Sequence, residues 1–218
     1  MTNPVGEGAS PSATGFRLSG IVSPGDTGPV EGYVLAGYVV ADPVVGPAWV
    51  DRAAAGREIT SVSNCLVDVR ELNAWSSSPV GAEAAGELVR RHPGTRVVAV
   101  GVAEADVDAL VEDLDEACWD PDLLNRLRRR VPLRAGLPLG FEPVGPGGGS
   151  FHTWLCLGGL VDSARQAVGV EPGRHGLVQD EGRARAAAAH LTEAFPYEHE
   201  VARWFALVLA EVEPGLLG

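Results

Sequence analysis

The stretch TRVVAVGVA, residues 95–103, constrains the fold of this chain more than any other feature of its sequence. It is apolar from Val97 to Ala103 and rich in β-branched residues, which is typical of a strand buried on both faces. The next segment, residues 104–117, carries apolar residues at helical spacing and carboxylates in its first turn. A strand that needs cover on both faces, followed directly by an amphipathic helix, predicts a sheet with helices packed on it.

Predicted strands and helices also alternate along the rest of the chain. Alternating or β-branched patterns bounded by Gly and Pro predict strands at residues 16–23, 31–41, 58–69, 95–103, 137–144 and 203–212. Helical spacing and capping residues predict helices at residues 46–56, 80–94, 104–117, 120–130, 151–168 and 180–194. The apolar run at residues 203–212 has no polar face, so a helix stays open as the alternative there. The first two strands, joined by a Pro/Gly turn, predict an antiparallel N-terminal hairpin.

These elements predict an α/β or α+β fold, with a mixed sheet and helices packed on it. Residues 1–14 are rich in Gly, Pro, Ser and Thr without apolar periodicity, which predicts a disordered N-terminal tail. We therefore expect one globular domain over residues 15–218.

The negative charge of the chain limits which classes of molecule it is expected to bind. The net charge is -12, which disfavours nucleic acid and anionic lipid as partners and favours a basic protein. The basic run Arg126–Arg130 is interpreted as a solvated helix face. No apolar run approaches the ~20 residues that span a bilayer, and the N-terminus lacks the pattern of a signal peptide, so we expect a cytoplasmic protein. The oligomeric state is left open.

The segment GPGGGSFHTWLC, residues 145–156, is the strongest candidate for a functional site. If a strand, a glycine-rich loop and a helix N-terminus follow one another here, the loop N–H groups could bind an anion. The candidate ligand-binding residues are Glu142, Gly148, Gly149 and Ser150. The loop lacks the Lys-Ser/Thr ending of a Walker A motif and the GxGxxG spacing of a dinucleotide site, so a plain connector is the competing interpretation.

A Cys/His pair is the second chemistry that this segment suggests. With Ser150 as helix cap, His152 and Cys156 would lie one turn apart on one helix face, where His152 could act as base and Cys156 as nucleophile. The alternative is that Cys156, among Trp154, Leu155 and Leu157, is a buried and inert thiol. Whether the protein is an enzyme is left open.

Metals and cofactors have weaker signals. The chain has three cysteines, Cys65, Cys118 and Cys156, with no CxxC pair, and its histidines form no HExxH spacing. We therefore predict no metal site and no cofactor.

The stretches PLGFEPVGPGGGSFHTWLCLGGL and GLVQDEGRARAAAAHL carry a resemblance that covers the C-terminal third to half of the chain. They resemble a group of small uncharacterised bacterial proteins with an LGFE…SFHSWLC…GL pattern, matched here at Leu139–Glu142, Ser150–His152, Trp154–Cys156, Gly176 and Leu177. This sequence has Thr153 where the pattern has serine. The resemblance implies no reaction, although small acidic proteins of this appearance include toxin-immunity proteins, which act by binding.

The leading functional hypothesis is a non-catalytic acidic protein-binding module with an immunity-like or regulatory role. The alternative is a Cys/His enzyme or an anion-binding protein with its site at residues 145–156.

Overall fold

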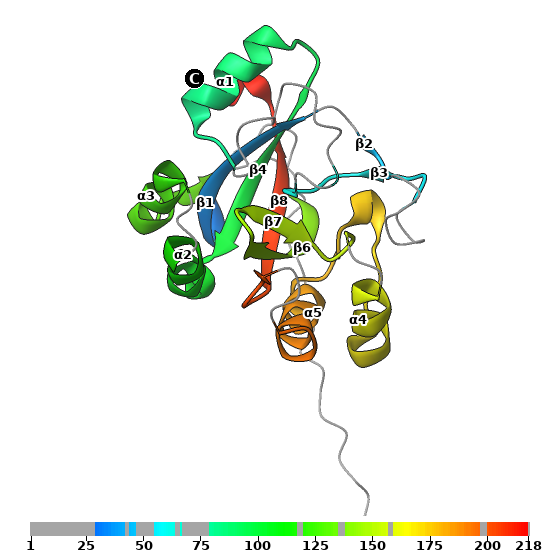
Figure 1. Cartoon of the computed structure of the whole chain (residues 1–218). Coiled ribbons are helices and arrows are strands. Elements are labelled where there is room, and N and C mark those ends of the chain that lie inside the picture. The colour runs from blue at the N-terminus through cyan, green and yellow to red at the C-terminus, as the bar shows by residue number, and fades with distance from the viewer. Residues whose placement is uncertain are drawn as a thin grey trace, which may run out of the picture.

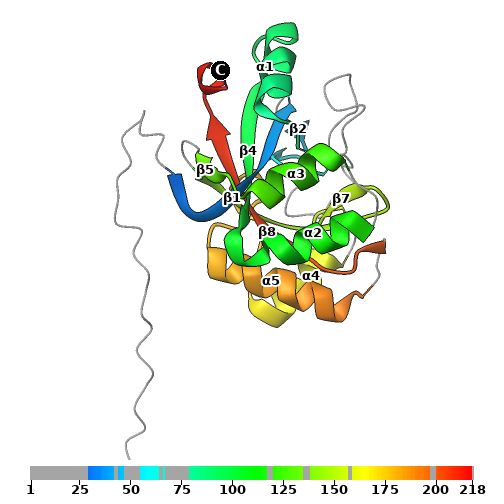
Figure 2. The same cartoon turned by 90° about the vertical axis from the view of Figure 1, so that its left-hand side faces the viewer.

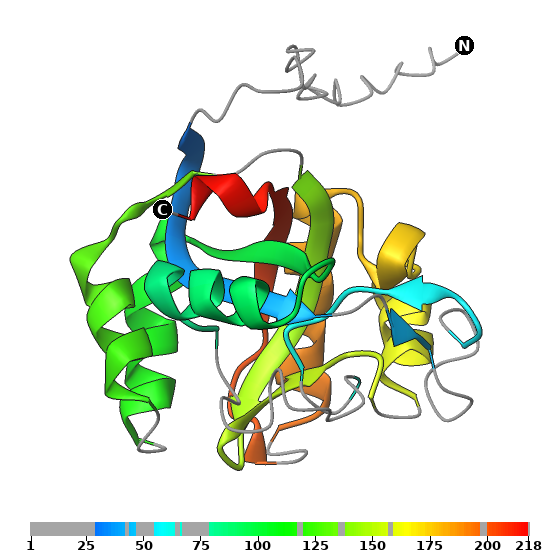
Figure 3. The same ribbon diagram turned by 90° about the horizontal axis from the view of Figure 1, so that it is seen from above.

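The computed structural model describes residues 29–41, 44–46, 55–63, 66, 79–116, 120–134, 138–156, 159–196 and 200–217. Its main sheet contains β1 (Pro29–Ala41), β4 (Arg96–Ala103), β5 (Pro132–Arg134), β6 (Pro138–Gly147), β7 (Ser150–Thr153) and β8 (Phe205–Val212). The strand order is β5-β1-β4-β8-β6-β7, and each of these pairings is antiparallel. β2 (Val44–Val45) and β3 (Glu58–Ile59) form a small second sheet on the side of the molecule away from α2 and α3 (Figure 3).

The helices are α1 (Ala82–Arg91), α2 (Val107–Glu116), α3 (Pro121–Arg129), α4 (Leu160–Val168) and α5 (Glu181–Ala194), with short 3-10 turns at Glu104–Asp106 (η1), Arg174–Gly176 (η2) and Pro214–Leu216 (η4). α3 begins as predicted, because Asp120 accepts a hydrogen bond from the Asp122 N–H and Pro121 occupies the first helical position. Asp180 caps α5 in the same way, by accepting from the Arg183 N–H.

Four of the helices form two pairs, α2 with α3 and α4 with α5, which cover different parts of the sheet (Figure 1). α2 and α3 pack through Leu110, Leu114, Leu123 and Leu127 on one face of β4 and β8. α4 and α5 pack near Ala206 of β8, whose side chain points to the opposite face from those of its neighbours Phe205 and Leu207. α1 contributes Ala85 to a third cluster, with Val97, Val208 and Leu217.

The architecture is therefore a single α+β domain, which resolves the alternative between α/β and α+β. The central strand at residues 95–103 and the strand at 203–212 are confirmed, and residues 98, 100 and 102 alternate with 97, 99 and 103 between the two faces. No described helix is long and apolar enough to cross a membrane.

Three predictions lie partly or wholly outside the described residues. The tail at residues 1–14, the strand at 16–23 that would complete the N-terminal hairpin, and most of the helix at 46–56 belong to this group. Within the described residues, β1 pairs with β4 and β5.

The strand predicted at residues 58–69 is wrong beyond Ile59 as far as this segment is described. Residues 60–63 are buried or half-buried as the pattern indicated, but they are irregular. The N–H groups of Val62 and Ser63 bond to side chains instead of continuing a strand ladder, since the Val62 N–H donates to Glu142 and the Ser63 N–H donates to the Ser61 hydroxyl.

Candidate functional site

The glycine-rich segment forms a β-hairpin, not a loop that enters a helix. Gly147 pairs with Ser150, and the two residues between them, Gly148 and Gly149, have φ values of 54° and 77°. Two consecutive positive φ values are what a tight two-residue hairpin turn requires, and glycine adopts them without steric cost. The helix predicted at 151–168 is therefore wrong at its start, since residues 150–153 are strand β7 and α4 begins at Leu160.

This hairpin removes the predicted helical geometry of the Cys/His pair. Ser150 is a strand residue and does not cap a helix. Phe151 and Thr153 are buried while Ser150 and His152 are half-buried, because successive side chains of a strand point to opposite faces. The His152 Nε2 lies 3.1 Å from the Gly147 carbonyl oxygen across the hairpin. Cys156 is half-buried in the turn after β7, with its Sγ 3.5 Å from the Ser63 Oγ.

Glu142 is the most unusual polar residue near this hairpin, because its side chain is fully buried. It lies on β6, and its carboxyl group accepts hydrogen bonds from the Ser61 hydroxyl and, at 2.9 Å, from the Val62 N–H. The Thr153 side chain of β7 also bonds to it. Glu142 therefore attaches residues 61–62, about eighty positions earlier in the chain, to the central sheet.

Burial raises the pKa of Glu142 to about 7. The hydrogen bonds from Ser61, Thr153 and the Val62 N–H favour the ionised form and act in the opposite direction, but desolvation is the larger effect. A carboxyl group that titrates near neutrality is a feature of many catalytic sites, and it is also what a buried structural carboxyl shows.

The polar groups around Glu142 form a connected set, which we call the Glu142 network: Glu142, Ser61, Ser63, Thr153 and Cys156. Ser61 links Glu142 to the Ser63 N–H, and the Ser63 hydroxyl contacts the Cys156 thiol. Ser61, Ser63, Thr153 and Glu142 are all buried. Such a network satisfies the polar groups of an irregular segment inside the core, which is a structural role.

The candidate ligand-binding residues are thus separated by the structure. Gly148 and Gly149 are exposed at the tip of the hairpin, whereas Glu142 lies in the core. The strand–loop–helix topology that would direct several N–H groups at an anion does not occur at residues 145–153.

Histidine and carboxylate side chains do not gather into a metal site among the described residues, where no group of three or more potential ligands is found. His175 is buried with its Nδ1 3.3 Å from the Glu58 carboxylate, and burial lowers its pKa. His190 of α5 contacts the Ser163 hydroxyl of α4 at 2.8 Å. His199, Cys65 and Cys118 lie outside the described residues.

The carboxylates of residues 104–116 are largely paired with arginines. The partners are Arg185 for Asp106, Arg130 for Asp108, Arg203 for Glu112 and Asp113, and Arg128 for Asp115. Seven carboxylates of this segment and Glu181, which also pairs with Arg185, face four arginines, so four negative charges remain uncompensated among these residues. The predicted solvated acidic face is therefore cross-linked by ion pairs but stays net negative.

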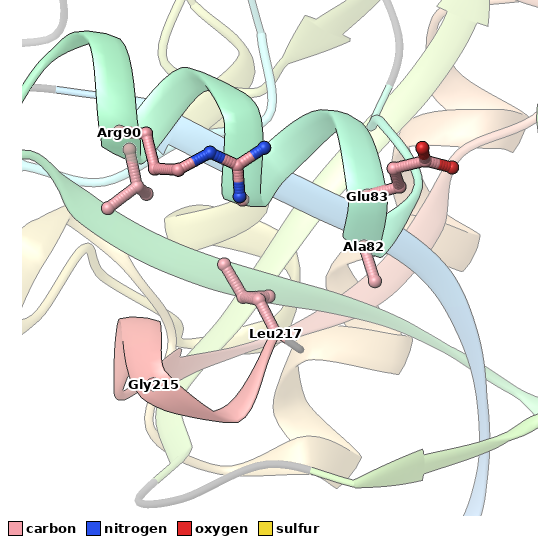
Figure 4. A pocket seen from close by; sticks show the side chains of 7 residues that line it. Ala82, Glu83, Arg90, Gly215 and Leu217 are labelled. Carbon is pink, nitrogen blue, oxygen red and sulfur yellow. The ribbon is translucent and has the colours of Figure 1, made fainter.

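Surface grooves lie beside α2 and beside α1. One, of about 480 Å³, lies between α2 and α5 and is lined by residues of both helices and by residues 203–206; we call it the α2/α5 groove. The other, of about 450 Å³, lies between α1 and the C-terminal η4 turn (Figure 4). Its wall carries Arg90 and Glu83, so its charges balance, and Leu217 lines it from the side of the C-terminus.

Sequence reasoning missed Ser61 and Thr153 as partners of Glu142, and Ser63 as the residue that connects Ser61 to Cys156. The local signal was that Ser61 and Ser63 fall on the same side as Ile59 in a segment whose pattern predicts a strand. Searches of protein-family models, curated proteins and solved structures found no match to this chain. The resemblance of the C-terminal third to small bacterial proteins therefore stays a prediction.

Proposed function

We propose that this protein is a non-catalytic binding module, immunity-like or regulatory in role, that engages a basic protein partner through the acidic surface around residues 104–116. The observation that carries the proposal is the surplus of carboxylates in this region, which remains after all of its arginine ion pairs are counted. A negative surface attracts cationic partners and speeds their association.

The positions of the candidate site residues in the structure support the same proposal. Glu142 is fully buried and bonds residues 61–62 to the sheet, and Cys156 contacts Ser63 in a half-buried turn. His152 lies on a strand beside the Gly147 carbonyl. The helical turn that would place Cys156 one turn after His152 is replaced by strand β7 at residues 150–153.

The ion pairs of α2 suggest how the acidic surface binds a partner. The ion pairs link α2 to α3 through Arg128 and Arg130 and link it to the start of β8 through Arg203. Because these pairs hold the carboxylates in place, a partner meets a preorganised surface, which reduces the entropy lost on binding.

The test uses two variants with the same net charge. The first carries Glu104→Gln, Glu116→Gln and Glu193→Gln, which neutralise exposed carboxylates on η1, α2 and α5. The control carries Glu31→Gln, Glu83→Gln and Glu213→Gln, which are exposed on other elements. Both variants change the net charge from -12 to -9.

Each protein is immobilised and used to capture proteins from a bacterial lysate at low ionic strength, and the captured proteins are identified and eluted with salt. We expect the wild type and the control to retain the same basic protein, and the first variant to lose it, because screening and neutralisation both weaken the attraction. Capture of no protein at low salt, or equal capture by both variants, would contradict the proposal.

A further inference from the structure

We infer that the partner protein binds to this acidic surface at the α2/α5 groove. The groove receives one bulky apolar side chain from a lysine- or arginine-rich segment of that partner. This inference rests on the proposed function and adds the place and the chemistry of the contact. The groove is lined from η1 and α2 on one side, from α5 on the other and by residues 203–206; both helices lie in the lower part of the molecule as drawn in Figure 2.

Small side chains create the space. The walls include Ala109 of α2 with Ala188 and Ala189 of α5, and the floor includes Trp204, Phe205 and Ala206 where β8 begins. A volume of about 480 Å³ is in the range of small-ligand pockets, roughly 300–1,000 Å³. Alanines on both helices leave an apolar depression that a larger side chain would fill, as the central residues of protein interfaces do.

Two arginines that line the groove are held in ion pairs. Arg185 of α5 contacts Asp106 at 3.0 Å, and Arg203 contacts Asp113 at 2.6 Å. The α5 residues that line the groove run from Arg185 to Glu193, eight residues apart, which corresponds to roughly 12 Å along a helix axis. This length suits a single inserted side chain and not a whole helix.

The same ion pairs argue against a small polar ligand. Both guanidinium groups that line the groove are held by carboxylates, Arg185 by Asp106 and Glu181, and Arg203 by Glu112 and Asp113. A small-molecule site needs a few polar groups free to orient its ligand. The charges that line the groove balance, two carboxylates against two guanidinium groups, and the negative surplus comes from Glu181, Glu112 and Asp113, which pair with these arginines from outside the lining. An apolar groove inside such a negative rim matches an apolar residue flanked by cationic ones.

The carboxylates around the groove favour cationic residues beside the apolar side chain of the partner. Glu193 lines the groove, and Glu104 and Glu116 lie exposed at the two ends of the η1–α2 segment. A lysine or arginine beside the inserted side chain would meet one of these carboxylates. The apolar anchor then supplies most of the affinity, while the charges supply orientation and rate of association.

The probe is a short capped peptide, Lys-Lys-Gly-Lys-X-Lys-Gly-Lys-Lys, in which X is tryptophan or alanine, and its affinity for the full chain is measured at low and high salt. Ala189→Trp fills the groove from an exposed position on its wall, and Ala186→Trp places the same residue at an exposed position of α5 that does not line the groove. Glu193→Lys is a third variant that reverses a charge of the groove without filling it.

We expect the wild type to bind the tryptophan peptide about tenfold or more tighter than the alanine peptide, because burying one large side chain contributes this much. Ala189→Trp should abolish the difference and Ala186→Trp should preserve it. Glu193→Lys should weaken both peptides equally.

The outcomes separate this inference from the proposed function. If both peptides bind with the same affinity, or if Ala189→Trp keeps the tryptophan preference, the inference is wrong while salt-dependent binding still supports the acidic surface. If a neutral peptide with the same tryptophan binds as tightly, the groove is a small-ligand or general apolar site and the inference is wrong. If neither cationic peptide binds at low salt, the inference and the proposed function both fail.

Discussion

Replacing Glu142 by glutamine separates the hydrogen bonds of this residue from the cost of burying its charge. A glutamine can accept from the Val62 N–H with its carbonyl oxygen and donate from its amide nitrogen to the Ser61 oxygen. The contacts to Ser61 and Val62 are then retained, with one donor reversed, and the Thr153 hydroxyl can act as donor or acceptor toward the amide. The substitution therefore leaves residues 61–62 attached to β6 but removes the titration.

The size of the effect follows from the raised pKa. The ordinary value of 4.5 and the folded value of about 7 mean that the folded protein keeps a proton that the unfolded chain has lost over this range. Stability therefore falls as the pH rises through this window, and Glu142 costs about 3 kcal/mol once the pH is well above 7. Between about pH 5 and about pH 8 the expected loss is roughly 2.5 kcal/mol.

The assay is urea denaturation of the wild type and of Glu142→Gln at both pH values. The two proteins should have similar stability at the lower pH, where Glu142 is protonated, and the variant should be more stable by about 2 kcal/mol or more at the higher pH. Glu213→Gln, at an exposed carboxylate, should follow the wild type. Parallel pH profiles for wild type and Glu142→Gln would refute the account of Glu142 as a buried, neutral carboxyl group.

Three further predictions concern the hairpin and its surroundings. Gly149→Val should cost about 1–2 kcal/mol more than Gly149→Asn in urea denaturation, because no atom crowds this position and only its positive φ opposes a side chain; equal costs would contradict the two-residue turn. Gly145→Ala should destabilise strongly, since an added Cβ would overlap the Val201 Cγ1, and Val201→Ala in the same chain should recover part of the loss; no recovery would refute this steric cause. Cys156 should be alkylated slowly in the native protein and rapidly after unfolding, as read by peptide mass spectrometry, because it is half-buried against Ser63; fast alkylation in the native state at neutral pH would restore a reactive thiol.

Much of the fold follows from local pattern. The strands at 95–103 and 203–212 and the helices starting after Asp120 and Asp180 were predictable, because apolar content, helical spacing and capping residues agree there. The strand at 203–212 could be distinguished from a helix only by its β-branched and aromatic residues, since a strand buried on both faces has no polar side.

The hairpin at Gly148–Gly149 was predicted as a helix entry because Ser150 has the chemistry of a helix cap. The same letters also fit a two-residue turn, in which paired glycines supply two positive φ values. The pairing partner decides between the two, and Val144 with Thr153 forms a register that only the assembled sheet provides.

The Glu142 network was beyond local pattern for a different reason. Glu142 and Ser61 are far apart in the chain, and nothing in either neighbourhood indicates that they meet. The sequence singled out Glu142 through its motif, but it pointed to a ligand site, whereas burial makes the residue an internal attachment point. The α2/α5 groove was missed because it depends on how two helices with alanines on their facing sides sit beside β8.

The most direct test of the account is an amide NMR titration of the full chain with the tryptophan-containing lysine peptide at low salt. The account predicts salt-sensitive shift changes concentrated at residues 104–116, 185–193 and 203–206, with residues 147–156 unaffected. Shift changes centred on His152 and Cys156 would contradict it and return the functional site to the hairpin.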